Sequence, residues 1–226
     1  MKDKKVNLFI VGAAKSGTTS LHSILNEHSE IFMCPIKEPH FFSKDIDPLL
    51  FRDEYKRSNK FDIKKYLKNK PLPKKHISFV RDIAVYFELF REVLNEKFIG
   101  EASPSYLYSE IAAKEIYNHN KNAKIIIILR NPIERLISHY KMDISSGRQN
   151  EKNILRGVLE DYNKKSKGWG INNLYIELSQ YKKQIKRYLD LFKPESILLL
   201  NFDDLKNNEN MIFEEIKKFL KLTEIK

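Results

Sequence analysis

Short, unbroken apolar runs recur along the chain, and polar turns separate them. The clearest run is KIIIIL at Lys124–Leu129, and VNLFIV at residues 6–11 is another. Weaker runs lie at Ile31–Met33, residues 97–100 and residues 196–201. A strand that is covered on both faces of a sheet is apolar throughout, so these runs predict buried parallel strands.

Segments with helical spacing alternate with these runs. In residues 18–27, Leu21, Ile24 and Leu25 recur at the spacing that places side chains on one face of a helix. Strands that alternate with helices predict an α/β fold with a central parallel sheet and helices on both of its faces.

The later helices carry their own start signals or apolar faces. One is predicted to begin at Pro132, with Asn131 as its cap and Glu134 in its first turn. Two more are predicted over residues 174–192 and Glu209–Leu220, on either side of the last strand.

The length of 226 residues suits one domain, spanning residues 1–226. Its 41 Lys and Arg against 30 Asp and Glu give a net charge of +11, which attracts anionic partners, although a lysine-rich surface kept for solubility explains the excess equally well. Residues 52–75 hold ten of these cations against three acids. We interpret the region around residues 47–76 as an exposed basic insertion, and a solvated face is its ordinary explanation.

Two features bear on cellular location. Cys34 is the single cysteine, so no disulfide can form within the chain, which fits a reducing compartment. The apolar run at residues 6–11 is too short for the core of a signal peptide or for a membrane span. We therefore expect a cytoplasmic protein with no membrane span.

The first strand leads into a turn rich in small residues, Gly12-Ala-Ala-Lys-Ser-Gly-Thr-Thr-Ser20, and then into a helix. Successive backbone N–H groups and a helix N-terminus can bind one anion in such a turn. Gly12, Gly17 and Thr19 match the nucleotide-triphosphatase loop G-x-x-x-x-G-K-[ST], but Thr18 occupies the lysine position and Lys15 lies inside the loop. That lysine could offset charge on a leaving phosphate.

The stretch KSGTTSL after an apolar strand resembles the 5′-phosphosulfate loop of sulfotransferases. The closest resemblance is to the heparan sulfate sulfotransferase branch and its bacterial relatives. It implies a P-loop-NTPase-like three-layer fold and 3′-phosphoadenosine 5′-phosphosulfate (PAPS) as the sulfuryl donor. A sulfuryl group carries less charge than a γ-phosphoryl group, so no metal is expected. The resemblance assigns the 5′-phosphosulfate to Lys15, Ser16, Gly17, Thr18, Thr19 and Ser20, with Lys15 assisting transfer.

A second motif follows the clearest strand. Arg130 stands at its carboxyl end, over the ligand crevice of an open α/β sheet, and Ser138 lies two helical turns later. A guanidinium and a hydroxyl so placed could bind a phosphate. The spacing resembles the 3′-phosphate site of sulfotransferases, which assigns that group to Arg130 and Ser138. Arg135, on the same helix, is expected to be solvated.

The segment Lys37-Glu-Pro-His-Phe-Phe42 carries the candidate base. Attack on sulfur requires removal of a proton, and Glu38 or His40 could remove it. The segment resembles the K-E-x-H-F-F stretch of glycosaminoglycan sulfotransferases, whose glutamate is the base. We therefore assign Glu38 as the base and His40 as its partner or an acceptor contact. In an extended segment, both side chains would point to one side. That branch often has an acid where this chain has Ser43.

Three further stretches match the family more weakly. Residues 100–106, GEASPSY, resemble G-E-x-S-P-x-Y, although Ser103 before Pro104 equally suits a helix cap. Tyr181 falls in a G-x-Y-like element, and Asp203 or Asp204 is expected to cap a helix. Related sulfotransferases continue past the helix matching Glu209–Leu220 with a basic loop over the cofactor. We expect that covering segment to be missing, which would weaken donor binding.

The predicted function is therefore sulfuryl transfer to a hydroxyl or amine of an acceptor, expected to be a sugar or polysaccharide. A P-loop nucleotide kinase or ATPase is an alternative, but Thr18 replaces its lysine and Arg130 follows the strand where an acid is needed. A non-enzymatic anion-binding module is another, and the basic excess allows it. No nucleic-acid-binding motif is present, so nucleic acid is not an expected partner.

Overall fold

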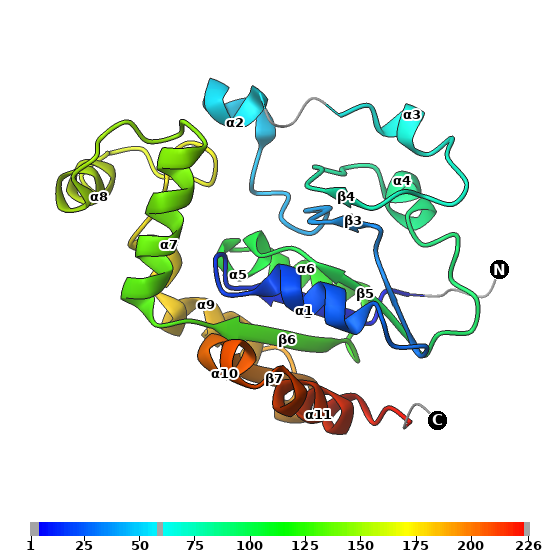
Figure 1. Cartoon of the computed structure of the whole chain (residues 1–226). Coiled ribbons are helices and arrows are strands. Elements are labelled where there is room, and N and C mark those ends of the chain that lie inside the picture. Colours follow the sequence, from blue (N-terminus) through cyan, green and yellow to red (C-terminus); the bar gives the residue numbers. More distant parts are fainter. Residues whose placement is uncertain (1–4, 58–60, 224–226) are drawn as a thin grey trace.

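A parallel sheet forms the centre of the protein, as the computed structural model of residues 5–57 and 61–223 shows (Figure 1). Within these residues the main sheet has five strands, in the order β2-β5-β1-β6-β7. They are β1 (Leu8–Gly12), β2 (Ile31–Met33), β5 (Phe98–Ala102), β6 (Lys124–Leu129) and β7 (Ile197–Asn201). All five predicted strands are confirmed, with ends that shift by at most two residues.

Helices cover both faces of this sheet, as predicted (Figure 1). Because side chains alternate along a strand, Phe9 and Ile125 enter one core while Leu8 and Ile126 enter the other. The second core is closed by α1 (Thr18–Leu25), α10 (Phe202–Asn207) and α11 (Glu209–Leu220). The first packs against α5 (Ser105–Tyr108), α6 (Ala112–His119) and α9 (Tyr181–Leu189).

Two helices extend past the carboxyl edge of the sheet, α7 (Pro132–Ser145) and α8 (Ile154–Tyr162) (Figure 1). The side chain of Asn131 accepts hydrogen bonds from the backbone N–H groups of Ile133 and Glu134, so the predicted cap of α7 is confirmed. This cap fixes the direction in which α7 leaves β6, and thereby the faces that α7 presents beside the strand ends.

The region between β2 and β5 adds a small second sheet, in which β3 (Ile36–Lys37) pairs in parallel with β4 (Lys75–His76). It also holds α2 (Asp53–Arg57), α3 (Ile63–Tyr66) and α4 (Ile83–Glu88). The basic stretch is largely exposed, as predicted, but Tyr66 and Leu72 are buried in the first core. The insertion is therefore docked on the domain; its residues 58–60 lie outside the described part of the chain.

Some predicted boundaries are wrong. The helix predicted over residues 174–192 begins only at Tyr181, because Leu174 has a left-handed φ of 57° and a short 3-10 turn, Glu177–Ser179, intervenes. Neither Asp203 nor Asp204 caps α10, since the side chain of Asn201 accepts that hydrogen bond.

Two structural features bear on the expected location. Cys34 is a buried free thiol. Over residues 5–57 and 61–223, no helix has the length and apolar character needed to cross a bilayer.

Candidate active site

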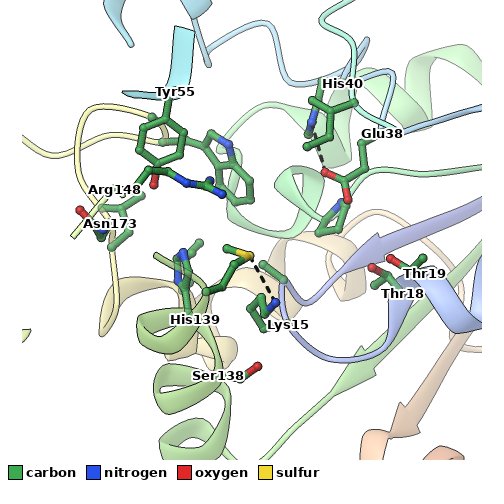
Figure 2. A pocket seen from close by; sticks show the side chains of 18 of the residues that line it. Lys15, Thr18, Thr19, Glu38, His40, Tyr55, Ser138, His139, Arg148 and Asn173 are labelled. Atoms are coloured by element: carbon green, nitrogen blue, oxygen red, sulfur yellow. Dashed lines mark hydrogen bonds and ion pairs between the residues drawn. The ribbon is translucent and has the colours of Figure 1, made fainter. Parts of the chain in front are cut away.

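A cavity of about 520 Å³ opens at the carboxyl edge of the main sheet (Figure 2). The chain leaving β1, β5, β6 and β7 contributes Lys15, Pro104, Arg130 and Phe202 to its wall. The crevice beyond the carboxyl ends of parallel strands is where open α/β sheets bind ligands. The cavity therefore lies where the sequence motifs were expected to meet.

The turn after β1 forms one side of this cavity. Gly17 has a φ of 84° and precedes α1, and a Cβ there would lie 2.9 Å from the ring of Phe202, so glycine is required. No side chain caps α1, whose first N–H groups have no acceptor within the helix. Thr18 and Thr19 line the cavity. The turn can thus donate backbone hydrogen bonds to an anion.

Two residues of the predicted phosphosulfate set lie elsewhere. Ser16 is fully buried and Ser20 is exposed, and neither belongs to the cavity wall. Their neighbours Lys15, Gly17, Thr18 and Thr19 do line it.

Lys15 enters the cavity from a left-handed backbone position, with a φ of 66°. Its Nζ donates a hydrogen bond to Sδ of Met142 on α7 at 3.3 Å (Figure 2). Burial lowers the pKa of Lys15 from its ordinary value, although the nearby carboxylate of Asp143 opposes that shift. A half-buried ammonium held by a thioether is available to an anionic ligand, because sulfur is only a weak acceptor.

Arg130 and Ser138 lie on the side of the cavity where β6 passes into α7. The guanidinium of Arg130 stacks 4.5 Å above the ring of Phe202 and pairs with Glu134 at 3.3 Å. Ser138 is half-buried on α7 and also lines the cavity (Figure 2). The structure thus brings both predicted phosphate contacts to the same cavity as Lys15.

Glu38 follows β3, and its carboxylate, on a side chain that is 12% exposed, has three positively charged or hydrogen-bonding partners. Lys37 Nζ forms an ion pair with Oε1, His76 Nε2 lies 3.3 Å from Oε1, and His40 Nε2 lies 3.5 Å from Oε2. Burial alone would raise the pKa of Glu38, but Lys37 and the two imidazoles hold it well below its usual range. The segment is not extended, because Glu38 and His40 have φ values of 69° and 52°. Both nevertheless line the cavity.

His40 is buried, and both of its ring nitrogens have partners. Nδ1 lies 2.6 Å from Ser105 Oγ, while Nε2 faces Glu38. The ring stacks on Phe79 with centroids 4.3 Å apart. Burial lowers the pKa of His40, so its imidazole is neutral. It contacts Glu38 on the side that faces the protein interior.

A second carboxylate, Glu101, lies behind this segment and outside the cavity wall. It accepts hydrogen bonds from Tyr86 at 2.6 Å and from Tyr106 and Ser103 at 3.0 Å. Burial raises the pKa of Glu101 to about 7. Ser103 Oγ also accepts a hydrogen bond from the backbone N–H of His40 at 3.2 Å, so it braces this segment and does not cap α5.

Arg135 is a correction to the sequence prediction, which expected it to be solvated. It is completely buried, and its Nε donates to Ser179 Oγ at 2.6 Å. Helical spacing indicates the face on which Arg135 lies but not the distant segment that covers it. Burial lowers its pKa to about 10.

Sequence reasoning missed the wall opposite the phosphate turn. Figure 2 shows Tyr55, Arg148 and Asn173 there. Arg148 stacks 4.9 Å from the ring centroid of Tyr55, and Asn173 donates to the buried Asp143 at 2.6 Å. Trp169, Phe79 and His139 also line the cavity. One signal was available: Trp169 is the only tryptophan in the chain and lies between two glycines.

Backbone strain concentrates around this cavity. The described residues include six non-glycine positions with positive φ, and five of them line the cavity: Lys15, Glu38, His40, Ile77 and Leu174. Such conformations cost roughly 1–3 kcal/mol each, and they cluster at functional sites. The distribution of strain supports this cavity as the functional site.

Comparison with known proteins gives a consistent result. A family model described as "Sulfotransferase domain" matches residues 5–225. The crystal structure of a sulfotransferase from Alicyclobacillus acidocaldarius superimposes with a TM-score of 0.78 at 29% identity, covering 97% of this chain and 82% of that one.

Curated relatives are similar at lower identity. Carbohydrate sulfotransferase 15 of Homo sapiens is 24% identical over 96% of this chain and 44% of its own length. Heparan sulfate glucosamine 3-O-sulfotransferase 5 of Mus musculus is 26% identical over 94% and 52%, respectively. A membrane-associated sulfotransferase of Dictyostelium discoideum is 30% identical over 64% and 24%. The chain thus spans about half or less of the length of these relatives.

Proposed function

The chain belongs to the sulfotransferase domain family, and from that membership we propose that it transfers a sulfuryl group from PAPS to a hydroxyl or amine of a carbohydrate. The observation that carries the proposal is the convergence on one cavity of the phosphate turn, Arg130 with Ser138, and Glu38. These are the groups needed to bind a nucleotide with phosphates at both ends of its ribose and to accept a proton.

The residues at the strand ends fit such a donor. The uncapped N-terminus of α1 and the turn before it suit the 5′-phosphosulfate, because their N–H groups are available to an anion. Arg130 and Ser138 suit the 3′-phosphate, since a guanidinium presents several donors and the hydroxyl adds one. When bound, PAPS would supply the sulfuryl group.

Lys15 and Glu38 would carry the chemistry. Lys15 stabilises negative charge that develops on the departing 5′-phosphate, for which its ammonium must leave Met142. Glu38 accepts the proton of the acceptor hydroxyl or amine as the new bond to sulfur forms. His40 does not touch the reacting atoms in this scheme; it orients Glu38 through Nε2 while Ser105 fixes its own ring.

The opposite wall of the cavity suits a sugar acceptor. Trp169, Phe79 and Tyr55 offer aromatic surface, and Arg148 and Asn173 offer donors for hydroxyl or acidic groups. Two relatives are named as a carbohydrate sulfotransferase and a heparan sulfate glucosamine 3-O-sulfotransferase, which supports an acceptor of this class.

A transfer assay tests the proposal. The purified chain is incubated with PAPS and a panel of neutral and acidic oligosaccharides, and adenosine 3′,5′-bisphosphate release and sulfated product are measured. We expect acceptor-dependent release, which Lys15→Met lowers by about 10²–10³-fold. Turnover of ATP with Mg²⁺, but not of PAPS, would instead favour the kinase or ATPase alternative. Salt-dependent polyanion binding without any turnover would favour a binding module.

A further inference from the structure

Two histidines flank the Glu38 carboxylate, and they come from different segments. His40 lies two residues after Glu38, whereas His76 lies on β4, which pairs with β3 so that His76 is opposite Lys37. His76 Nε2 is 3.3 Å from Glu38 Oε1, and His40 Nε2 is 3.5 Å from Oε2. Each carboxylate oxygen therefore faces one imidazole.

The two imidazoles differ in access to water. The side chain of His40 is 1% exposed, and its Nδ1 is engaged by Ser105 Oγ at 2.6 Å. The side chain of His76 is 58% exposed and also lines the cavity. His76 thus contacts both the Glu38 carboxylate and the solvent, whereas His40 has almost no access to water.

The environment of Glu38 makes a proton on its carboxylate short-lived. Lys37 and both imidazoles hold the pKa of Glu38 well below its usual range, so the neutral acid is disfavoured there. Burial lowers the pKa of His40, which makes that ring a poor proton acceptor. A proton taken from the acceptor must leave Glu38 before the next turnover, and His40 is poorly suited to carry it.

We propose that His76 is the proton-transfer residue that receives the acceptor's proton from Glu38 and passes it to water. This inference rests on the proposed sulfotransferase function and extends it to a residue outside the two sequence motifs. It gives a role to the end of the basic insertion, because β4 brings an exposed imidazole to the Glu38 carboxylate.

The acceptor oxygen or nitrogen forms a bond to sulfur, the bond from sulfur to the 5′-phosphate oxygen breaks, and the phosphate keeps that electron pair. The acceptor's proton moves to Glu38. His76 accepts the proton from Glu38 at Nε2 while its own proton is on Nδ1, and it releases the Nδ1 proton to water. Proton exchange with water at the exposed ring then restores the starting tautomer. Glu38 is then a carboxylate again.

The charged and titratable groups around His76 come from β4, its own strand, and from the neighbouring segment that contains β3. Glu38, Lys37 and His40 lie on the neighbouring segment, and Lys75 precedes His76 on β4. Among the described residues, Glu38 is the only carboxylate that lies within ion-pair distance of His76. It is therefore the one acidic group from which His76 can accept a proton directly.

Chemical rescue tests the proposal. His76→Ala should keep its affinity for adenosine 3′,5′-bisphosphate and lose about 10- to 100-fold in kcat, less than the ~10²–10⁴-fold typical of losing the base itself. Added imidazole should restore much of that loss, because the vacated position is open to solvent, and the rescue should rise with the concentration of the neutral form. Lys75→Ala, at the adjacent exposed position, should behave as wild type.

His76→Gln separates proton transfer from hydrogen bonding. Glutamine can donate a hydrogen bond to Glu38 but cannot carry a proton, so we expect the same loss as in His76→Ala. Near-wild-type kcat in either variant, or a loss that imidazole does not restore in a folded protein, would overturn the assignment. Wild-type protein that transfers no sulfuryl group to any acceptor would instead refute the proposed function.

Discussion

The two walls of the cavity are built in different ways. The wall proposed to bind the donor, called the donor wall below, comes from two contiguous stretches, residues 14–19 and 130–138, each placed directly after a buried strand. The wall proposed to bind the acceptor, called the acceptor wall below, comes from residues 38–55, 76–79 and 148–174, which are distant in sequence and mostly irregular. The sheet itself orients the first wall, whereas long-range packing assembles the second.

This contrast predicts that the two walls contribute to different properties of the protein. Donor binding should depend on the donor wall alone, because its groups are fixed by strand ends and the start of α1 and α7. Turnover and acceptor affinity should depend on the other wall. Substitutions that change only donor binding, or only turnover and acceptor affinity, would support this division between the walls. Substitutions that change both would contradict it.

The largest expected effect is that of Glu38→Gln. Loss of the base should lower kcat by about 10²–10⁴-fold while adenosine 3′,5′-bisphosphate affinity is kept. Because the pKa of Glu38 is depressed, its carboxylate should persist in the wild type to pH values below the ordinary 4.5, so its protonation should limit kcat only in that acidic range. A pH–rate profile and calorimetry measure the two effects. Parallel loss of nucleotide affinity would show that Glu38 is a structural part of the donor wall.

Lys15→Met should have the next largest effect. It keeps the length of the stem but removes the charge that stabilises the leaving phosphate, so we expect about a 10²–10³-fold loss in kcat. Lys141→Met, an exposed position on α7, is the matched control. Transfer within a few-fold of wild type, with an unchanged melting temperature, would remove Lys15 from its role.

Arg130→Ala should act on nucleotide affinity alone. Hydrogen bonds to charged groups contribute about 1.5–3 kcal/mol, so affinity for adenosine 3′,5′-bisphosphate should fall about 10- to 100-fold. Affinity for 5′-AMP, which lacks the 3′ group, should change much less. Glu134→Gln removes the ion pair of Arg130 and serves as the control. Equal losses for both nucleotides would place Arg130 away from the 3′-phosphate.

Trp169→Ala should have the smallest effect, confined to the acceptor. Losing an aromatic contact of about 0.5–1.5 kcal/mol should raise the acceptor KM by about 3- to 10-fold. Trp169→Phe should restore most of the affinity. Steady-state kinetics at saturating PAPS measure the change, and weaker binding of adenosine 3′,5′-bisphosphate would contradict the division between the walls.

The same contrast explains what could be predicted from the sequence. β6 was predicted to the residue because four consecutive isoleucines leave no other explanation for Lys124–Leu129. The cap and start of α7 were predicted because Asn131 and Pro132 are local signals. The donor wall follows from such local signals, since a motif that ends a buried strand must lie at the carboxyl edge of the sheet.

The remainder depends on packing between distant segments. Leu174 and Leu178 have helical spacing, but the left-handed backbone at Leu174 and the turn before Tyr181 delay the helix. Arg135 was expected in solvent because nothing near it in sequence indicates that Ser179 and Tyr175 cover it. His76 reaches Glu38 only through the pairing of β3 with β4, two very short strands without an apolar pattern.

The left-handed residues around the cavity have a consequence for how the protein tolerates heat. Packing around each of these residues keeps its backbone in an unfavourable conformation. When that packing becomes more mobile, the residue can relax to a lower-energy conformation. The main sheet is buried on both faces, and none of its non-glycine residues has a positive φ. Warming should therefore relax the geometry at Lys15, Glu38 and His40 before the sheet opens. We therefore expect the geometry of the cavity to be lost some degrees below the temperature at which the chain unfolds.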